Sequence, residues 1–326
     1  MVFFIFSFLV SLIFPILLKK FLSKTRLSSN KEKPMFLGIS IYLSSFIIFL
    51  LAKIYYKLDA SFLTAVFAGA SFILLFGVWD DIKNLSVKTK LIGQMAAAFI
   101  AIFMGVRTSI VYFPDWLNLV VTLVWILALV NAFNFLDIMD GLCAGVSLIV
   151  SFIFLAMSIV FKAPYSISVF FWVLSGALFA AFIYNKPAAK FYLGDSGSML
   201  IGFIFACSTM EISYAPDTSQ SLALFAPILI VILPVYDLFF TVFMRWRKGK
   251  AISKKSGEHF ALMLKDKGFS ARKILVIMYA ACLLSGLSAF LLKALPLYFK
   301  SWFLGFLAMV ILILSVLFFK VLKTND

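Results

Sequence analysis

The feature that most constrains this chain is a series of eleven apolar runs, most of them long enough to cross a lipid bilayer. A membrane-spanning helix needs roughly 20 apolar residues, so eleven spans would use about two thirds of the chain. Hydrophobic residues make up 64% of the 326 residues and charged residues only 13%, which excludes a soluble fold because the polar surface is too small to cover the apolar surface. The runs are residues 2–18, 36–54, 62–79, 91–106, 116–133, 143–161, 166–184, 198–211, 222–243, 274–295 and 301–321.

We therefore predict an all-α, polytopic bundle of about 10 or 11 transmembrane spans, folded as one integral-membrane domain over residues 1–326. Two of the runs, 91–106 and 198–211, are short for a span. The first run precedes Lys19 and Lys20, whereas a cleavable signal carries its basic residues first. We expect this first segment to remain in the membrane.

The net charge of +15 would suggest a nucleic-acid partner in a soluble protein, but here it is explained by basic loops on the cytoplasmic side of a membrane. With the N-terminus outside, 23 of the 29 lysine and arginine residues lie on the cytoplasmic side. We expect no nucleic-acid partner, contact with membrane lipid, and a location in a bacterial-type inner membrane. The cytoplasmic segments are then 19–35, 80–90, 134–142, 185–197, 244–273 and 320–326.

Acidic residues gather on the same side, which the distribution of basic charge does not require. Charged groups near the hydrocarbon boundary are costly and tend to be functional. We expect four cytoplasmic loops, 80–90, 134–142, 185–197 and 244–273, to converge on one polar site. An oxygen-rich cluster without paired cysteine or histidine suits a hard cation such as Mg²⁺, with Mn²⁺ as a substitute.

The first two loops supply carboxylates and amides. Asp80 and Asp81 close one helix, and Lys90 lies at the head of the next. A pair of interfacial acids neutralised by nearby lysines is the simpler interpretation of this loop. In the second loop Asn134, Asp137 and Asp140 recur every three residues, so on a helical turn they would share one side. The alternative is that they cap the helix that begins near residue 141.

The third loop contains G-D-S-G, residues 194–197. Gly194 lets the backbone approach a ligand, Asp195 offers a carboxylate, and Ser196 and Ser198 can cap the following helix. Taken alone, this motif is also typical of an ordinary turn. The fourth loop carries ten basic residues and the single histidine, His259, and could form a cationic lid over a pyrophosphate. A basic loop that only holds topology is the simpler alternative.

These motifs, taken in order, resemble the polyprenyl-phosphate N-acetylhexosamine-1-phosphate transferases, glycosyltransferase family 4. The family includes the phospho-MurNAc-pentapeptide translocase of peptidoglycan synthesis and the enzymes that load GlcNAc-1-phosphate onto undecaprenyl phosphate, and the chain looks closer to the second branch. The resemblance extends from about residue 31 to 273. The matching residues are Asp80 and Asp81 with Lys90 and Gln94, N-A-x-N-F-x-D-x-x-D-G at 131–141, G-D-S-G-S at 194–198, and Pro234 with Asp237.

The resemblance implies transfer of an N-acetylhexosamine-1-phosphate, by default GlcNAc-1-phosphate, from a UDP-sugar to polyprenyl phosphate at the cytoplasmic face. Homodimers are common in the family, although the sequence does not fix the oligomeric state. Asp195 and Asn134 would hold Mg²⁺. The catalytic residues would be Asp80, Asp81, Lys90 and His259. The substrate-binding residues would be Asn131, Asp137, Asp140, Gly194, Ser196, Arg245, Lys254 and Lys255.

The chain departs from the family pattern in several places, among them an early Arg-x-Gly-Gly element that is reduced to P-M-F-L-G at residues 34–38. Ile138 stands where the family usually has glycine, and Ala261 and Leu262 replace the later histidines of its H-x-H-H segment. These departures speak against the pentapeptide translocase and leave open a catalytically inactive lipid-binding scaffold. A cation-coupled transporter is another class, but its acidic residues would be expected near the bilayer midplane rather than at loop ends.

Overall fold

The structure is a computed structural model and describes residues 1–21, 34–211, 225–249, 257–296 and 298–309. Within these ranges the chain is helical and contains no strand, which confirms the predicted all-α fold. A further helical stretch covers residues 298–309. The helices are α1 (Val2–Phe21), α3 (Leu37–Tyr56), α4 (Ser61–Lys83), α5 (Val87–Phe103), α6 (Asp115–Leu136), α7 (Leu142–Val160), α8 (Tyr165–Asn185), α9 (Gly194–Glu211), α10 (Ala226–Ile230), α11 (Ile232–Arg247), α12 (Phe260–Asp266) and α13 (Ala271–Ala294).

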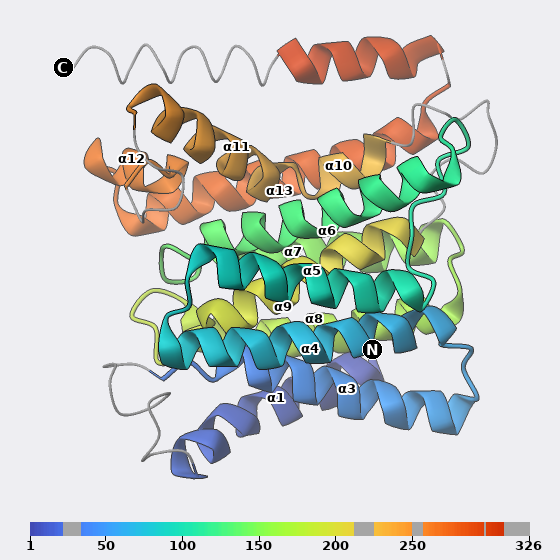
Figure 1. The fold of residues 1–326 in the computed structure, drawn as a ribbon, viewed down its shortest axis with the longest axis vertical. Coiled ribbons are helices and arrows are strands. Elements are labelled where there is room, and N and C mark those ends of the chain that lie inside the picture. Colours follow the sequence, from blue (N-terminus) through green and yellow to red (C-terminus); the bar gives the residue numbers. More distant parts are fainter. Residues whose placement is uncertain (22–33, 212–224, 250–256, 297, 310–326) are drawn as a thin grey trace.

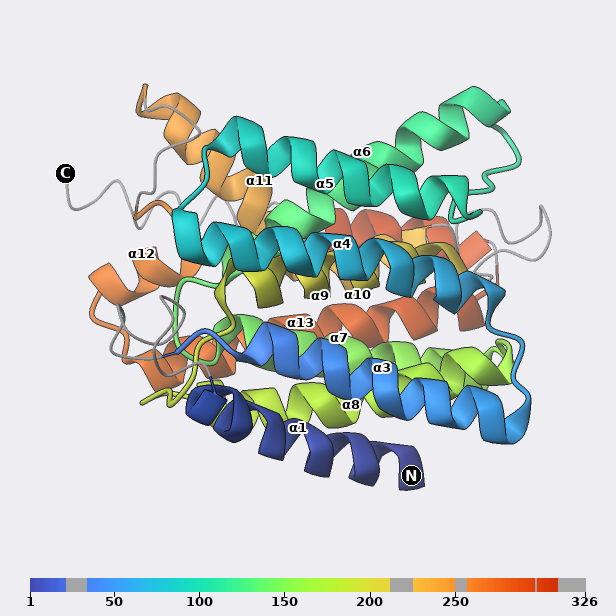
Figure 2. The same cartoon turned by 60° about the horizontal axis from the view of Figure 1, so that its bottom comes forward.

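The long helices run roughly side by side and form one bundle around α9 (Figures 1 and 2). Helix α9 packs mainly against α4 and α6 and also contacts α3. Most of its residues are buried, although its sequence is only moderately apolar. Helix α1 packs on α8 and α3 at the edge of the bundle, and α13 packs on α7 and α10. The helix that begins with G-D-S-G is thus surrounded by the other helices.

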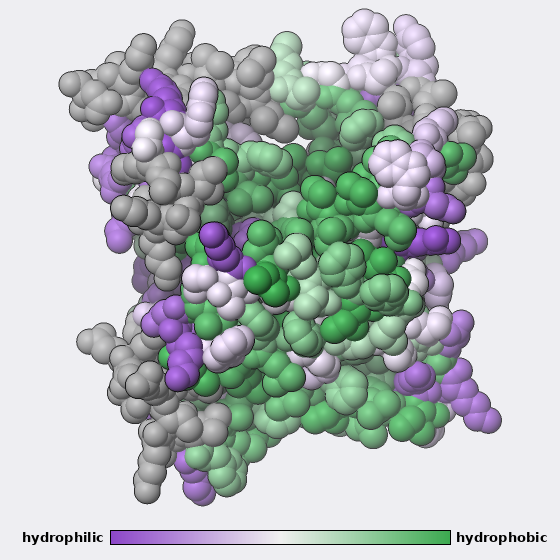
Figure 3. Space-filling view, viewed as in Figure 1, coloured by the Kyte–Doolittle hydropathy of each residue, from purple (hydrophilic) through white to green (hydrophobic). Residues whose placement is uncertain are grey.

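Seven helices of the described chain are long and apolar enough to cross a membrane, namely α1, α3, α4, α6, α7, α8 and α13. Green apolar side chains cover the middle of the surface in Figure 3, and purple polar ones gather at both ends. Such a band cannot be stable in water, and it matches the hydrocarbon layer of a bilayer. Among the other predicted spans, α5 has only 17 residues, α9 is more polar, and residues 310–321 lie outside the described ranges.

The run 222–243, predicted as one span, is not a continuous helix. The chain is broken at Val231 into the short helix α10 and the longer α11. Pro234, in the first turn of α11, has no backbone N–H to donate to the carbonyl four residues earlier, so the helix cannot run through unchanged. Beyond the break, α11 carries Asp237 and Arg245 towards the end of the bundle where the predicted loops meet.

The connections α4–α5, α6–α7 and α8–α9 lie at one end of the bundle together with α12, on the left of Figure 1. The sequence predicted this common side from apolar runs alone. Which membrane face it occupies, and whether the N-terminus is outside, stay predictions.

Candidate active site

Lys90 lies between two carboxylates that come from other helices. Its Nζ is 2.9 Å from Asp195 Oδ2 and also contacts Asp80 Oδ2. Asp80 is fully buried in the last turn of α4, and its Oδ1 accepts the backbone N–H of Leu85 at 2.7 Å. Burying a carboxylate is costly unless it is paired and hydrogen-bonded, and both conditions are met here. The structure therefore brings three of the predicted site residues into one ion-paired cluster.

Asp81 has a different partner from Asp80. Its Oδ1 accepts the backbone N–H of Asp195 at 2.8 Å, and its Oδ2 accepts that of Ser196 at 3.2 Å. These are among the first amides of α9, which have no partner inside their own helix. The sequence predicted that Ser196 and Ser198 would cap this helix, and that was wrong. Asp81 supplies the cap from another helix, while the Ser198 hydroxyl donates to the Gly194 carbonyl at 2.9 Å.

Glycines allow the three helices around this cap to approach closely. A Cβ on Gly194, whose φ is +70°, would lie 2.6 Å from Asp81 Oδ2. A Cβ on Gly38, in the first turn of α3, would lie 2.5 Å from the backbone nitrogen of Gly197, and one on Gly77 of α4 would lie 2.5 Å from Ser196 Cα. The first turn of α9 is thus held by backbone-to-backbone packing, which larger residues would prevent.

Asn134, in the last turn of α6, reaches the same cluster. Its Nδ2 donates to Asp195 Oδ1 at 2.7 Å and to the Ser198 hydroxyl at 3.0 Å. Burial alone would raise the pKa of Asp195, but the side chains of Asp80, Lys90 and Asn134 outweigh it and lower the pKa to about 2. Asp195 is therefore ionised at neutral pH and serves as the anionic centre of the cluster.

Asn131, one helical turn before Asn134, forms a reciprocal amide pair with Gln94. Asn131 Nδ2 donates to Gln94 Oε1 at 2.8 Å, and Gln94 Nε2 donates to Asn131 Oδ1 at 3.3 Å. Asn131 Nδ2 also donates to the Leu127 carbonyl at 2.7 Å. The structure places Asn131 beside the cluster as a link between α5 and α6. Its predicted contact with substrate stays a prediction.

Asp137 and Asp140 do not continue the helical register of Asn134. Helix α6 ends at Leu136, and the chain turns through Gly141, whose φ is +84°. Asp140 Oδ2 accepts the backbone N–H of Ala189 at 3.0 Å. The N-cap residue of α7 is Gly141, which makes no side-chain cap. The predicted three-residue alignment is wrong for the physical reason that the helix stops first.

Asp137 is half-buried just beyond the end of α6. Burial raises its pKa, and the charges of Asp195, Asp81 and Asp140 add to the effect, bringing the pKa to about 8. At neutral pH the carboxyl of Asp137 therefore holds a proton. A cation or a protonated group that approaches the cluster would favour release of that proton.

Two residues that the sequence analysis did not select hold the loop that contains Asp137 and Asp140. Asn185 Oδ1 accepts the Gly141 backbone N–H at 3.1 Å, and the Tyr279 hydroxyl donates to the Gly141 carbonyl at 2.6 Å. The Tyr279 ring lies against Gly145, where a Cβ would be only 2.2 Å from the hydroxyl oxygen. Asn185 lies at the end of one predicted span and Tyr279 inside another. Neither residue belongs to a local sequence motif that would have indicated this role.

His259 belongs to a second, buried cluster. Its Nδ1 lies 3.0 Å from Asp237 Oδ2 and 3.3 Å from the Thr241 hydroxyl. Its ring meets the ring of Phe135 edge-on, with centroids 5.6 Å apart. Phe135 directly follows Asn134 on α6, so the two clusters are neighbours along that helix.

The predicted cationic lid is only partly described. Arg245 is buried, with its guanidinium carbon 5.2 Å from the centre of the Phe135 ring. Lys248 is close to Arg245 in sequence, and its Nζ lies 3.5 Å from Glu258 Oε1. Lys254 and Lys255 lie outside the described residues. Arg245 thus belongs with Phe135 and the histidine cluster, and its predicted contact with substrate stays a prediction.

The side chains of the cluster include oxygen donors of the kind that the expected Mg²⁺ would need. In the described part of the chain, no three His, Cys, Asp or Glu side chains form a cage for a metal ion. Mg²⁺ does not need one, because it usually takes one or two carboxylates, waters and substrate phosphates. Asp195 presents a carboxylate, and the ammonium of Lys90 occupies a cationic position between it and Asp80. Asn134 donates its amide Nδ2 to Asp195, so its oxygen would face a shared cation only after the amide group turned over. The carboxylate of Asp195 fits a hard cation, and Asn134 fits one after that turn.

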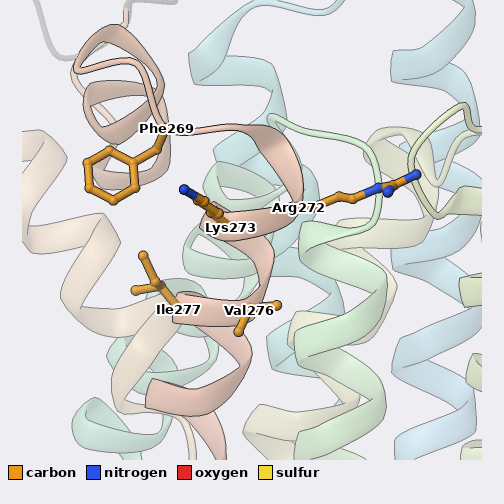
Figure 4. Close-up of a pocket in the computed structure, with 5 residues that line it drawn as sticks. All are labelled: Phe269, Arg272, Lys273, Val276 and Ile277. Atoms are coloured by element: carbon orange, nitrogen blue, oxygen red, sulfur yellow. The ribbon is translucent and has the colours of Figure 1, made fainter.

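A separate pocket of about 320 Å³ lies where α12 leads into α13 (Figure 4). It is lined by Phe269, Arg272, Lys273, Val276 and Ile277, whose side chains are drawn in the figure. Exposed apolar groups beside basic ones are typical of the boundary between a membrane and water. None of its lining residues belongs to either cluster.

The fold and site together define an integral membrane protein with a charged, oxygen-rich cluster at one end of its helical bundle. The model of glycosyl transferase family 4 matches residues 63–213, which include Asp80, Lys90, Asn134 and Asp195. The histidine cluster lies mostly beyond the matched region.

Three curated relatives share most of the chain. The decaprenyl-phosphate N-acetylglucosaminephosphotransferase of Mycobacterium tuberculosis is 31% identical over 278 residues, covering 75% of this chain and 67% of its own length. The enzyme of the same name from Mycobacterium leprae is 30% identical, and the match covers 75% of this chain and 68% of the relative. The undecaprenyl-phosphate alpha-N-acetylglucosaminyl 1-phosphate transferase of Escherichia coli is 26% identical, and the match covers 78% of this chain and 71% of the relative. The chain belongs to glycosyl transferase family 4.

Proposed function

We propose that this protein transfers N-acetylglucosamine-1-phosphate from a UDP-sugar to a polyprenyl phosphate such as undecaprenyl phosphate. UMP is released, and a lipid-diphosphate sugar for cell-envelope glycan synthesis remains in the membrane. The observation that carries the proposal is the Asp80–Lys90–Asp195 cluster at the end of an apolar bundle. The names of three relatives, each of which specifies an N-acetylglucosamine phosphotransferase acting on a polyprenyl phosphate, support the same chemistry.

The reaction brings together two anions, the lipid phosphate and the diphosphate of the sugar nucleotide. Their repulsion must be screened before the lipid phosphate oxygen can bond to the β-phosphorus. Lys90 supplies one positive charge, and its position between Asp80 and Asp195 orients it. Asp195 and Asn134 would hold Mg²⁺, which would supply positive charge to offset the negative charge of the phosphate groups. A new P–O bond forms as the bond from the β-phosphorus to the UMP oxygen breaks.

Direct attack by the lipid phosphate is favoured over a covalent phospho-aspartate at Asp80. Both oxygens of Asp80 are engaged, one by the backbone N–H of Leu85 and the other by Lys90. Its side chain is fully buried, so an in-line approach of a phosphorus atom would require this pair to open. In this proposal Asp80 orients Lys90, and the active end of the bundle faces the cytoplasm, where sugar nucleotides are found.

The test is reconstitution of the purified protein in nanodiscs with undecaprenyl phosphate, UDP-GlcNAc and Mg²⁺, followed by mass measurement of the lipid product and assay of UMP. We expect both substrates to be required and Asp195→Asn to abolish transfer. The matched control is Asp115→Asn, which alters an exposed aspartate at the opposite end of α6. Undiminished product in excess chelator would overturn the metal assignment. Ion-driven charge movement without UMP would favour a transporter.

The identity of the sugar is the second part of the test. UDP-GlcNAc is the default, and UDP-GalNAc, UDP-QuiNAc and UDP-FucNAc are the other donors to screen with the same lipid. The donor with the highest kcat/KM identifies the substrate. Equal use of all donors would argue against a selective sugar pocket.

A further inference from the structure

The buried pair of Asp237 and His259 joins two segments next to the proposed active site. Asp237 lies on α11, and His259 immediately precedes α12. Asp237 Oδ2 is 3.0 Å from His259 Nδ1, and Asp237 Oδ1 accepts the backbone N–H of Phe260 at 2.9 Å. Both side chains are almost fully buried, at 1% and 6% exposed. One carboxylate therefore fixes both the imidazole and the backbone that carries it.

This geometry determines which ring nitrogen faces Asp237. A carboxylate can only accept a hydrogen bond, so a hydrogen bond between the two groups in that form requires the tautomer that carries its proton on Nδ1. Nε2 is then the nitrogen left for another partner. Nδ1 also lies 3.3 Å from the Thr241 hydroxyl, so two groups on the same face of α11 surround it.

The rest of the environment packs this histidine against α6. The His259 ring meets the edge of Phe135, the residue after Asn134, and Arg245 lies against the same aromatic ring. Glu258 is buried beside His259 in sequence. A histidine held in this way cannot turn freely, because its ring is constrained by α6 on one side and α11 on the other.

We propose that Asp237 is a positioning residue for His259. It holds the imidazole with Nδ1–H directed at Oδ2, which leaves Nε2 as the nitrogen that can exchange a proton or a hydrogen bond with a substrate. This inference rests on the proposed transferase function for the role of His259, but the hydrogen-bonded form of the ring can be tested without any activity. Asp237 does not touch the reacting atoms and acts only through His259.

The first experiment uses the fact that the chain has one histidine. Solid-state NMR of the full-length protein labelled with ¹⁵N-histidine in lipid bilayers at pH 8 gives signals from a single imidazole. We expect a protonated Nδ1 in the wild type and loss of this preference in Asp237→Asn, whose amide can donate to Nδ1 instead. Asp115→Asn should leave the signals unchanged. An unprotonated Nδ1 in the wild type would overturn the proposal, even if the Asp237 variant failed to fold.

The second experiment is a double-mutant cycle on kcat/KM for each substrate. We expect Asp237→Asn to lower kcat/KM about tenfold, which is less than the loss typical when an acid or base itself is removed. We expect His259→Gln to lower kcat/KM at least as much. The double variant should be no slower than His259→Gln alone, because Asp237 acts through the histidine. Additive losses would overturn the positioning role.

The two experiments separate the two hypotheses. If the wild type releases no UMP with any donor but shows the Nδ1–H form, the proposed function fails and the ring geometry stands. If the enzyme is active and Nδ1 carries no proton, only the positioning role of Asp237 fails.

Discussion

Asp81 and Asp195 are 114 residues apart in sequence, yet the carboxylate of Asp81 accepts the backbone N–H of Asp195 at 2.8 Å. One acid therefore holds in place the backbone of the other, at the point where α9 begins. Such a bond from a charged acceptor to an otherwise unpartnered helix amide is among the stronger hydrogen bonds in proteins. It explains why the two neighbouring acids Asp80 and Asp81 have separate tasks.

Replacing Asp81 tests this cap. Asp81→Asn keeps the shape of the side chain but removes the charge and turns one acceptor into a donor facing the Ser196 amide. We expect the free energy of unfolding to fall by about 1 to 3 kcal/mol and transfer activity to fall as Asp195 shifts. The measurements are thermal unfolding in detergent and UMP release. A variant as stable as the Asp115→Asn control would contradict the capping role.

Gly194 is the backbone position that the cap depends on. Its φ of +70° disfavours a side chain, and a Cβ would lie 2.6 Å from Asp81 Oδ2. Gly194→Ala should therefore cost about 1 to 3 kcal/mol of stability and most of the activity. The control is Gly305→Ala, since an added Cβ there meets nothing within 4 Å. Equal unfolding midpoints for the two variants would show that the space around Gly194 adapts.

The proton on Asp137 should make stability depend on pH. The folded protein keeps this proton to a pKa of about 8, whereas an aspartate in the unfolded chain loses it near 3.8. Between these values the folded state binds more protons, so the free energy of unfolding falls as pH rises through the window and falls no further above it. Asp137→Asn should make the unfolding midpoint decline less between pH 5 and 8. Parallel curves for the two proteins would refute this.

Tyr279 offers a test of the loop that carries Asp137 and Asp140. Tyr279→Phe removes only the hydroxyl that donates to the Gly141 carbonyl at 2.6 Å. We expect a loss of about 1 kcal/mol and a several-fold rise in KM for the sugar nucleotide. Tyr298→Phe, on an exposed ring, is the control. An unchanged KM would show that the loop keeps its place without this bond.

Much of the fold and part of the site could be predicted from the sequence. Apolar runs located the helices because a backbone inside the hydrocarbon layer must satisfy its own hydrogen bonds, and a helix does so within one segment. Counting those runs placed Asp80, Lys90, Asn134 and Asp195 at one end, and the structure brings these four residues into contact. The count worked because successive spans alternate in direction, so loops two spans apart share a side.

The ends of helices and the pairing of side chains between helices could not be predicted from the alternation of spans. Helix α6 stops at Leu136, so Asp140 turns to the backbone of Ala189 rather than joining Asn134. The break before α11 and the pairing of Asp237 with His259 were equally invisible, because a proline and an acid inside an apolar run have many local explanations.

The sequence by itself determined that the chain is a helical membrane protein whose acids and bases collect at one end, because that follows from transfer of side chains between water and lipid and needs no knowledge of neighbours. Only the tertiary structure decided which acid pairs with Lys90, which caps α9 and which holds a loop. Those choices depend on separations of a few ångströms between helices, set by the glycine contacts of Gly38, Gly77 and Gly197, and no local pattern of residues specifies them.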